Sequence, residues 1–187
     1  MSGSKGEGEN RVNLPNIITV GRILMVPLVV WAITSGELRI AFWLFVAAGI
    51  SDAVDGFLAN RLGAKSEFGA YLDPLADKVL LMSIYVTLGI AGLLPPWIVI
   101  AVVSRDIMIL GAIVVALIVG QPLTIQPLTI SKLNTTAQIL LAALVLGANG
   151  FHFDPGLAFD LALATVAVLT GLSAAAYLAA WMRHMAS

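Results

Sequence analysis

Long apolar segments, separated by short polar or proline-containing connections, recur along the whole chain. Each is close to the roughly 20 residues that a helix needs to cross the hydrocarbon core of a bilayer. Backbone groups in lipid must be hydrogen-bonded within their own segment, which favours helices for spans this long. The pattern predicts an all-α integral membrane protein, a six-transmembrane-helix bundle with spans near residues 17–35, 39–60, 69–92, 96–119, 133–149 and 157–182.

Two short segments precede the first predicted span. Residues 1–10 (MSGSKGEGEN) are small and polar, and we expect a disordered tail there. Residues 11–16 are expected to lie at the membrane interface, with Pro15 suited to a helix start. The rest of the chain, 11–187, is then predicted to form a single transmembrane domain.

Composition supports the membrane assignment. The 187 residues are 59% hydrophobic and 11% charged, whereas soluble domains carry about 25% charged residues. The chain has no cysteine, which excludes disulfides and thiolate metal sites. The net charge of -1 indicates no class of partner, and no nucleic-acid partner is expected.

The distribution of basic residues predicts the topology. With a cytoplasmic N-terminus, Arg39 is the single basic residue in an outside loop. The inside loops and tails then carry Lys5, Arg11, Arg61, Lys65, Lys132 and Arg183. Under the positive-inside rule both termini are cytoplasmic, and segment 52–77 lies at the cytoplasmic face.

Four aspartates in that segment are the main candidate for chemistry. Asp52 and Asp55 are i, i+3 neighbours, and Asp73 and Asp77 are i, i+4 neighbours, so each pair shares one face of a helix. Hard divalent cations prefer such oxygen ligands, and two of them would balance four carboxylates. Mg²⁺ is favoured and Mn²⁺ fits the same ligands, in the two-metal arrangement that serves displacement at phosphorus.

Small residues are interleaved with the acids. Gly56 and Ala59 follow Asp55, and Gly69 precedes Asp73 by one turn. Such residues either let two helices pack closely or leave a slot for a flat nucleotide base. The residues alone leave both interpretations open.

A second charged group lies in the middle of the fourth span, at Arg105 and Asp106. Each charge costs about 2.5–3.5 kcal/mol at the centre of a membrane helix on insertion scales, so such residues normally face the protein interior. Two interpretations stand: a functional site or a structural ion pair.

The segment resembles the CDP-alcohol phosphatidyltransferase family. Its motif is D-x-x-D-G-x-x-A-R, eight residues, then G-x-x-x-D-x-x-x-D. In register with it are Asp52, Asp55, Gly56, Ala59, Gly69, Asp73 and Asp77. One position departs: Asn60 stands at the family's arginine, and Arg61 follows it.

The resemblance implies a metal-dependent enzyme that uses CDP-diacylglycerol. Two Mg²⁺ or Mn²⁺ ions would be held by Asp52, Asp55, Asp73 and Asp77, with Asp77 also the general base. The cytidine would lie among Gly56, Ala59 and Gly69, and the other substrate-binding candidates are Arg61, Arg105 and Lys132. A homodimer in a bacterial-type inner membrane, with the active site at the cytoplasmic face, is the expected assembly.

The acceptor alcohol is a separate question. Ser104-Arg105-Asp106 and Ile130 to Asn134 look like the CMP-forming cardiolipin synthases, which use phosphatidylglycerol. The Asp73 to Lys78 stretch also looks like the phosphatidylglycerophosphate synthases, which use glycerol 3-phosphate. Few cations are available for a small dianion, which favours phosphatidylglycerol.

Two other classes of membrane protein also place acidic residues within the bilayer. A membrane prenyltransferase resembles a longer bundle with two acidic motifs far apart, whereas here both pairs lie on one hairpin. An ion-coupled transporter is the non-enzymatic alternative, because intramembrane acids often line ion paths. Against a transporter, no acidic residue continues an ion path across the outer half of the membrane, and the spans show no internal repeat.

Overall fold

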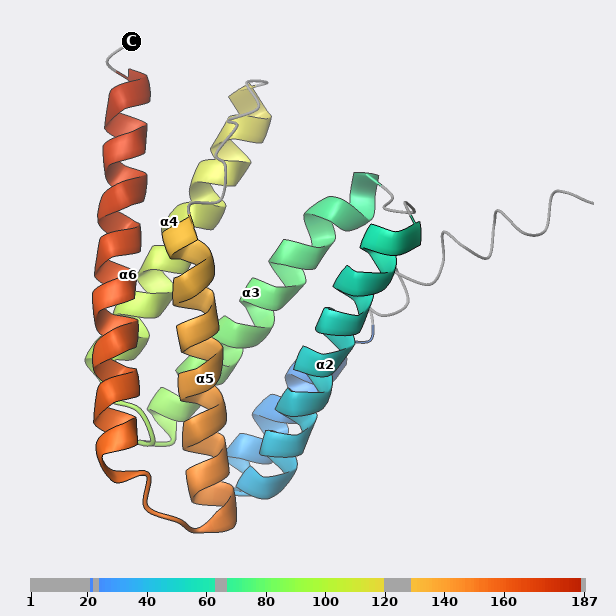
Figure 1. Cartoon of the computed structure of the whole chain (residues 1–187), viewed down its shortest axis with the longest axis vertical. Coiled ribbons are helices and arrows are strands. Elements are labelled where there is room, and N and C mark those ends of the chain that lie inside the picture. Colours follow the sequence, from blue (N-terminus) through green and yellow to red (C-terminus); the bar gives the residue numbers. More distant parts are fainter. Residues whose placement is uncertain (1–20, 22–23, 63–66, 120–128, 186–187) are drawn as a thin grey trace, which may run out of the picture. The chain divides into compact units, whose positions relative to one another are not determined.

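The described part of the chain is helical apart from the short turns that join its helices. A computed structural model describes residues 21, 24–62, 67–119 and 129–185, and the side chains of residues 24–51, 78–111 and 129–179 among them. An apolar helix, Leu24–Thr34, comes first. The five long helices that follow are α2 (Leu38–Leu62), α3 (Glu67–Ile90), α4 (Pro96–Val119), α5 (Thr129–Phe151) and α6 (Gly156–Met185) (Figure 1).

This architecture confirms the all-α prediction, and a helix lies at each predicted span. The fifth helix begins at Thr129, earlier than the expected start at 133. The added turn is polar, with Ser131 and Lys132, so the apolar pattern did not reveal it. The predicted tail 1–10, the interfacial segment 11–16 and the connection 63–66 lie outside the described residues.

Three turns between helices close in the same way, by a residue in the left-handed conformation. In the first, Gly36 has φ +77°, the Gly36 N–H donates to the Ile33 carbonyl and the Glu37 N–H donates to the Ala32 carbonyl. This is the Schellman arrangement, which satisfies carbonyls that the helix end leaves free. Gly92 after α3 repeats it with φ +73°.

The third turn uses a residue with a side chain. His152, after α5, has φ 58°, and the Phe153 N–H donates to the Ala148 carbonyl at 3.0 Å. The His152 side chain is exposed.

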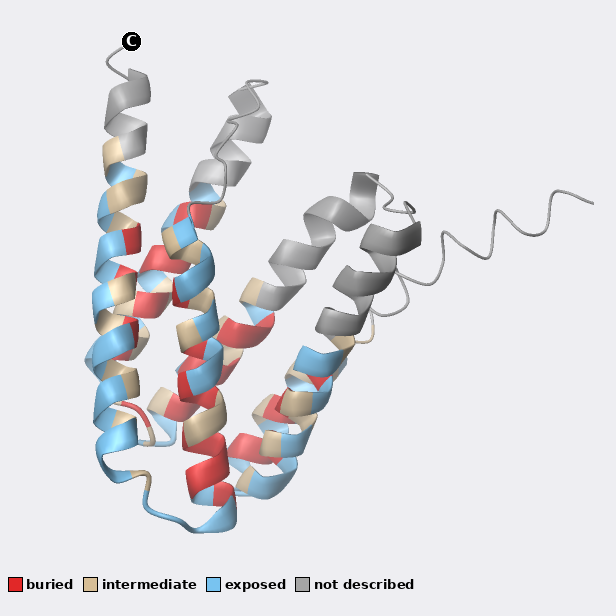
Figure 2. Ribbon diagram, in the orientation of Figure 1, coloured by how far each residue is buried: buried red, intermediate tan, exposed pale blue. Residues whose placement is uncertain are grey.

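The structure divides into two compact units, residues 1–84 and 85–187, and the boundary falls within α3. In the second unit, α6 packs against both α4 and α5. The buried positions of α5 include Asn134, Gln138, Leu141 and Val145, which recur at helical spacing and make one stripe (Figure 2). On α4 the buried stripe runs through Ile98, Val102, Arg105, Asp106 and Ile109.

The described part of this unit buries several polar side chains in an otherwise apolar core and also exposes many large apolar ones. Its buried polar residues include Arg105, Asp106, Asn134 and Gln138, while large apolar side chains are exposed. Among the latter are Ile100, Ile107, Leu140, Leu161, Val168 and Leu172. Apolar exposure on this scale marks a surface that contacts a membrane or another protein.

Length and composition single out two of the described helices as able to cross a membrane, Thr129–Phe151 and Gly156–Ala179. Shorter apolar helices are Leu24–Thr34, Leu38–Ser51 and Lys78–Ile90. The complete bundle of six spans remains a prediction.

Candidate active site

The four predicted metal ligands lie on two helices of the first unit. Asp52 and Asp55 fall within the last turns of α2, and Asp73 and Asp77 fall within the first half of α3. Both helices are continuous through these positions, so the spacing places the two acids of each pair on one helix face. The helical frame that the metal-site prediction requires is therefore present.

Side chains between 52 and 77 lie outside the described residues. The same holds for the side chain of Arg61 and for the surroundings of Gly56, Ala59 and Gly69. Among the residues whose side chains the structure describes, no group of three or more histidine, cysteine, aspartate or glutamate residues is placed to hold a metal. The metal and cytidine sites accordingly stay predictions.

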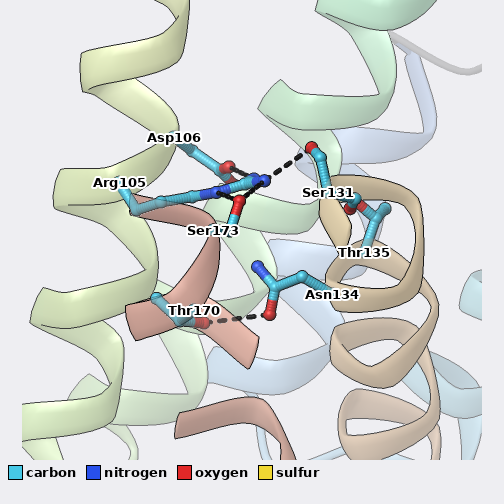
Figure 3. Close-up of polar contacts among 7 residues, drawn as sticks. All are labelled: Arg105, Asp106, Ser131, Asn134, Thr135, Thr170 and Ser173. Atoms are coloured by element: carbon cyan, nitrogen blue, oxygen red, sulfur yellow. Dashed lines mark hydrogen bonds and ion pairs between the residues drawn. The ribbon is translucent and has the colours of Figure 1, made fainter. Parts of the chain in front are cut away.

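A buried polar cluster occupies the second unit, centred on Arg105 of α4 (Figure 3). Its Nη1 is paired with the carboxylate of Asp106, and both side chains are almost completely buried. Nη2 donates to Ser131 Oγ of α5 at 2.6 Å and to Ser173 Oγ of α6 at 2.7 Å. Nε donates to the same Ser173 oxygen at 3.1 Å. One guanidinium thus joins three helices.

Two further contacts extend the cluster along α6. The Tyr177 ring centre lies 6.0 Å from Arg105 Cζ, within the range of a cation–π interaction. One turn away, Thr170 Oγ1 donates to Asn134 Oδ1 of α5 at 3.0 Å (Figure 3). The cluster therefore connects α6 to both of its neighbours through polar side chains.

The electrostatics of the cluster explain how it tolerates burial. A lone arginine in this position would carry a large desolvation cost. Here the adjacent Asp106 supplies the opposite charge, and the Ser131 and Ser173 hydroxyls accept from Nε and Nη2. The ion pair between Arg105 and Asp106, one of the two interpretations of these charges, is present. A role for Arg105 in binding substrate remains a prediction.

Lys132, the other basic candidate in this unit, lies beside Ser131 but is exposed. Its carbonyl accepts a hydrogen bond from Thr136 Oγ1 at 3.0 Å within α5. Arg105 and Lys132 therefore lie near the same turn of α5 in different environments. Arg105 is buried and paired with Asp106, whereas Lys132 is exposed.

Several members of the cluster were missed as candidate site residues. Thr170, Ser173 and Tyr177 are spaced i, i+3, i+7 on α6, so they share one face of a mostly apolar helix. That spacing was a usable signal. Tyr85 gave none: it is fully buried near the end of α3, and its hydroxyl donates to the Gln138 carbonyl at 3.0 Å.

Comparison with known proteins assigns the class. A sequence model of the family described as CDP-alcohol phosphatidyltransferase matches residues 12–182. The chain belongs to this family, which the resemblance of the aspartate motif had indicated.

Relatives within the family carry two different names. The chain is 33% identical over 188 residues to a probable CMP-forming cardiolipin synthase of Drosophila melanogaster, covering 91% of this chain and 56% of the relative. It is 32% identical over 185 residues to the CMP-forming cardiolipin synthase of Homo sapiens, covering 90% of this chain and 62% of the relative. A probable phosphatidylglycerophosphate synthase of Mycobacterium tuberculosis is 34% identical over 167 residues, covering 86% of this chain and 78% of the relative.

The chain thus spans 56% to 62% of the length of these two cardiolipin synthases. It matches the bacterial protein over a larger share of that relative's length, 78%. The names of the two sets of relatives differ in the product that they state, cardiolipin or phosphatidylglycerophosphate.

Proposed function

We propose that this protein transfers a phosphatidyl group from CDP-diacylglycerol to the hydroxyl of phosphatidylglycerol, giving cardiolipin and CMP. The observation that carries the proposal is the register of seven motif residues across α2 and α3, in a chain whose family match extends over residues 12–182. A transferase of this class needs positioning and charge neutralisation more than covalent catalysis.

The donor set fits divalent cations. Four carboxylates, paired on the helical frames of α2 and α3, offer the hard oxygen ligands that Mg²⁺ and Mn²⁺ prefer. Asp52, Asp55, Asp73 and Asp77 would hold two such ions. Bound there, the metals would neutralise the negative charge of the substrate diphosphate.

The protein's own residues then have separate roles. Asp77 accepts the proton of the acceptor hydroxyl, and the resulting oxygen forms a bond to the phosphorus that carries diacylglycerol. The bond from that phosphorus to the oxygen of CMP breaks, and CMP leaves. Gly56, Ala59 and Gly69 leave space for cytidine. Arg61 binds the charged part of the donor, whereas Arg105 and Lys132 bind that of the acceptor.

Phosphatidylglycerol is favoured as the acceptor by charge. Within the described side chains of the second unit, the one buried cation is Arg105, and its charge is matched by Asp106. Glycerol 3-phosphate is a small dianion that needs unpaired cations, whereas phosphatidylglycerol carries one negative charge and has lipid tails. The names of the human and fly relatives agree with this choice.

Phosphatidylglycerophosphate synthesis, with glycerol 3-phosphate as acceptor, is the second candidate. It is favoured by the Mycobacterium tuberculosis relative, because this chain covers 78% of that protein. The two candidates share the donor, the metals and CMP release, and they differ in acceptor alone.

The proposed setting is a bacterial-type inner membrane, with six spans, cytoplasmic termini and the active site at the cytoplasmic face. Exposed tryptophans support the membrane boundaries: Trp31, Trp43 and Trp97 are each more than half exposed and lie close to the turns 35–37 and 91–95. Tryptophan concentrates at membrane–water interfaces. A homodimer through small residues of α6 is proposed as the assembly.

The acceptor assignment is tested by product analysis. Purified protein in lipid or detergent is given CDP-diacylglycerol with Mg²⁺ or Mn²⁺ and either phosphatidylglycerol or glycerol 3-phosphate. Cardiolipin from the first reaction, with no phosphatidylglycerophosphate from the second, is the expected result. The reverse pattern would assign the second candidate, and CMP from neither reaction would refute the transferase proposal.

A further inference from the structure

Two hydroxyls on α6 form hydrogen bonds of a different kind from those of most other described serines and threonines. Serine and threonine in a helix usually donate to the carbonyl four residues earlier. Six residues do so here: Thr34, Ser51, Ser83, Thr135, Thr136 and Thr165. Thr170 and Ser173 instead bond to side chains of other helices.

Ser173 makes the stronger of these interhelical connections. Its oxygen receives both Nε and Nη2 of Arg105, at 3.1 and 2.7 Å, and it is fully buried. An arginine side chain is long and flexible, but contacts along the Nε edge fix the plane of the guanidinium as well as its position. Tyr177, one turn further along α6, lies against the same group.

We propose that Ser173 is a positioning residue, which sets the orientation of Arg105 for the acceptor lipid. This inference rests on the proposed function. With the Nε edge held by α6 and Nη1 held by Asp106, the Nη2 corner is directed at Ser131, the residue before Lys132 on α5 (Figure 3). These contacts fix the plane of the guanidinium within the protein itself, before an acceptor headgroup reaches it.

Loss of the Ser173 hydroxyl would leave the Arg105 guanidinium free to rotate without removing a charge. Two donors of Arg105 would lose their acceptor in a buried site, and the guanidinium would turn toward its remaining partners, Asp106 and Ser131. Binding of an acceptor that depends on the original orientation would weaken. Binding of CDP-diacylglycerol, whose proposed ligands lie on α2 and α3, would not change.

The test compares KM values for the two substrates in Ser173→Ala, Ser173→Thr and a control, Thr165→Ala. Thr165 is on the same helix, but its hydroxyl donates to the Leu161 carbonyl within that helix, at 2.7 Å. For Ser173→Ala we expect the KM of phosphatidylglycerol to rise about tenfold and the KM of CDP-diacylglycerol to stay within about twofold. Ser173→Thr, which keeps the hydroxyl, and Thr165→Ala should both stay close to wild type.

A second variant covers the case in which Ser173→Ala does not fold. Tyr177→Leu removes the ring beside Arg105 and leaves its hydrogen bonds in place, so the acceptor KM should rise by a smaller factor. An unchanged acceptor KM in a folded Ser173→Ala or Tyr177→Leu variant would refute the inference. So would a matched loss of activity with both substrates that follows thermal stability, because that is the result of a purely structural role.

Wild-type activity separates the two proposals. If wild type releases CMP and the variants behave as wild type, the positioning role alone is wrong. If wild type releases no CMP with phosphatidylglycerol or glycerol 3-phosphate, the proposed function is wrong and this role is refuted with it.

Discussion

Gln138 is the most unusual buried residue of the second unit. It is completely buried on α5, yet its Oε1 and Nε2 have no hydrogen-bonding partner among the described residues. Nδ2 of Asn134, one turn earlier, is in the same situation. A buried polar atom without a partner carries its full desolvation cost.

Replacement of this side chain should therefore stabilise the protein. Gln138→Met keeps the length of the side chain and removes the amide, while the Gln138 carbonyl still accepts from the Tyr85 hydroxyl. We expect a gain of about 1–3 kcal/mol in the free energy of unfolding, seen as a higher midpoint in thermal unfolding. Asn149→Leu is the control, because its amide already donates to the Val145 carbonyl at 2.8 Å; a loss of stability in Gln138→Met would contradict the account.

Among the turns that follow the helices, backbone strain is expected where a residue other than glycine has a positive φ. Gly36 and Gly92 adopt the left-handed conformation without a steric penalty, whereas His152 adopts it with a side chain. Histidine is tolerated there less well than glycine.

The turn after α5 should accordingly be improved by glycine. His152→Gly relieves the penalty at φ 58° and should raise stability by up to about 1 kcal/mol. The reciprocal change, Gly92→Ala at φ +73°, should lower stability by a similar amount. Chemical or thermal unfolding of both variants checks the sign, and a less stable His152→Gly would show that its side chain makes a favourable contact.

Helices were the predictable part of this molecule, and interhelical polar contacts were not. Apolar runs interrupted by glycine and proline, as at Gly92 to Pro96, locate the helices because backbone groups must be satisfied locally in lipid. The interior position of the charged pair at Arg105 was predictable for a different reason, because a charge that faces lipid is costly. The sequence did not reveal that Ser173, 68 residues away, accepts from Arg105, because helix rotation decides which polar groups meet.

The candidate active site also has a part that the sequence predicts and a part that depends on helix packing. The aspartate spacing is a local property, and the helices α2 and α3 preserve it. The relation of those helices to the cluster around Arg105 depends on packing between distant segments. At position 60 the chain departs from the family motif, with Asn60 in place of arginine.

For the whole molecule, the topology is open to a direct test because the chain has no cysteine. Single cysteines at Ser35 and Asp154 should react with a membrane-impermeant maleimide on intact cells, since both lie in predicted outside turns. Cysteines at Ser66 and Ser187 should react only after the membrane is opened. Labelling of Ser187→Cys on intact cells would contradict the cytoplasmic C-terminus.

The central claim is metal-dependent CMP release that requires Asp77. The most direct measurement follows CMP formed from CDP-diacylglycerol and phosphatidylglycerol by wild type, Asp77→Asn and the control Asp160→Asn, which changes an exposed acid of α6. We predict that chelation stops wild-type release and that Mg²⁺ or Mn²⁺ restores it. Asp77→Asn should lower the rate by about 10²–10⁴-fold, and Asp160→Asn should not lower it. CMP release by Asp77→Asn at the wild-type rate, or release that persists without divalent cations, would contradict the account.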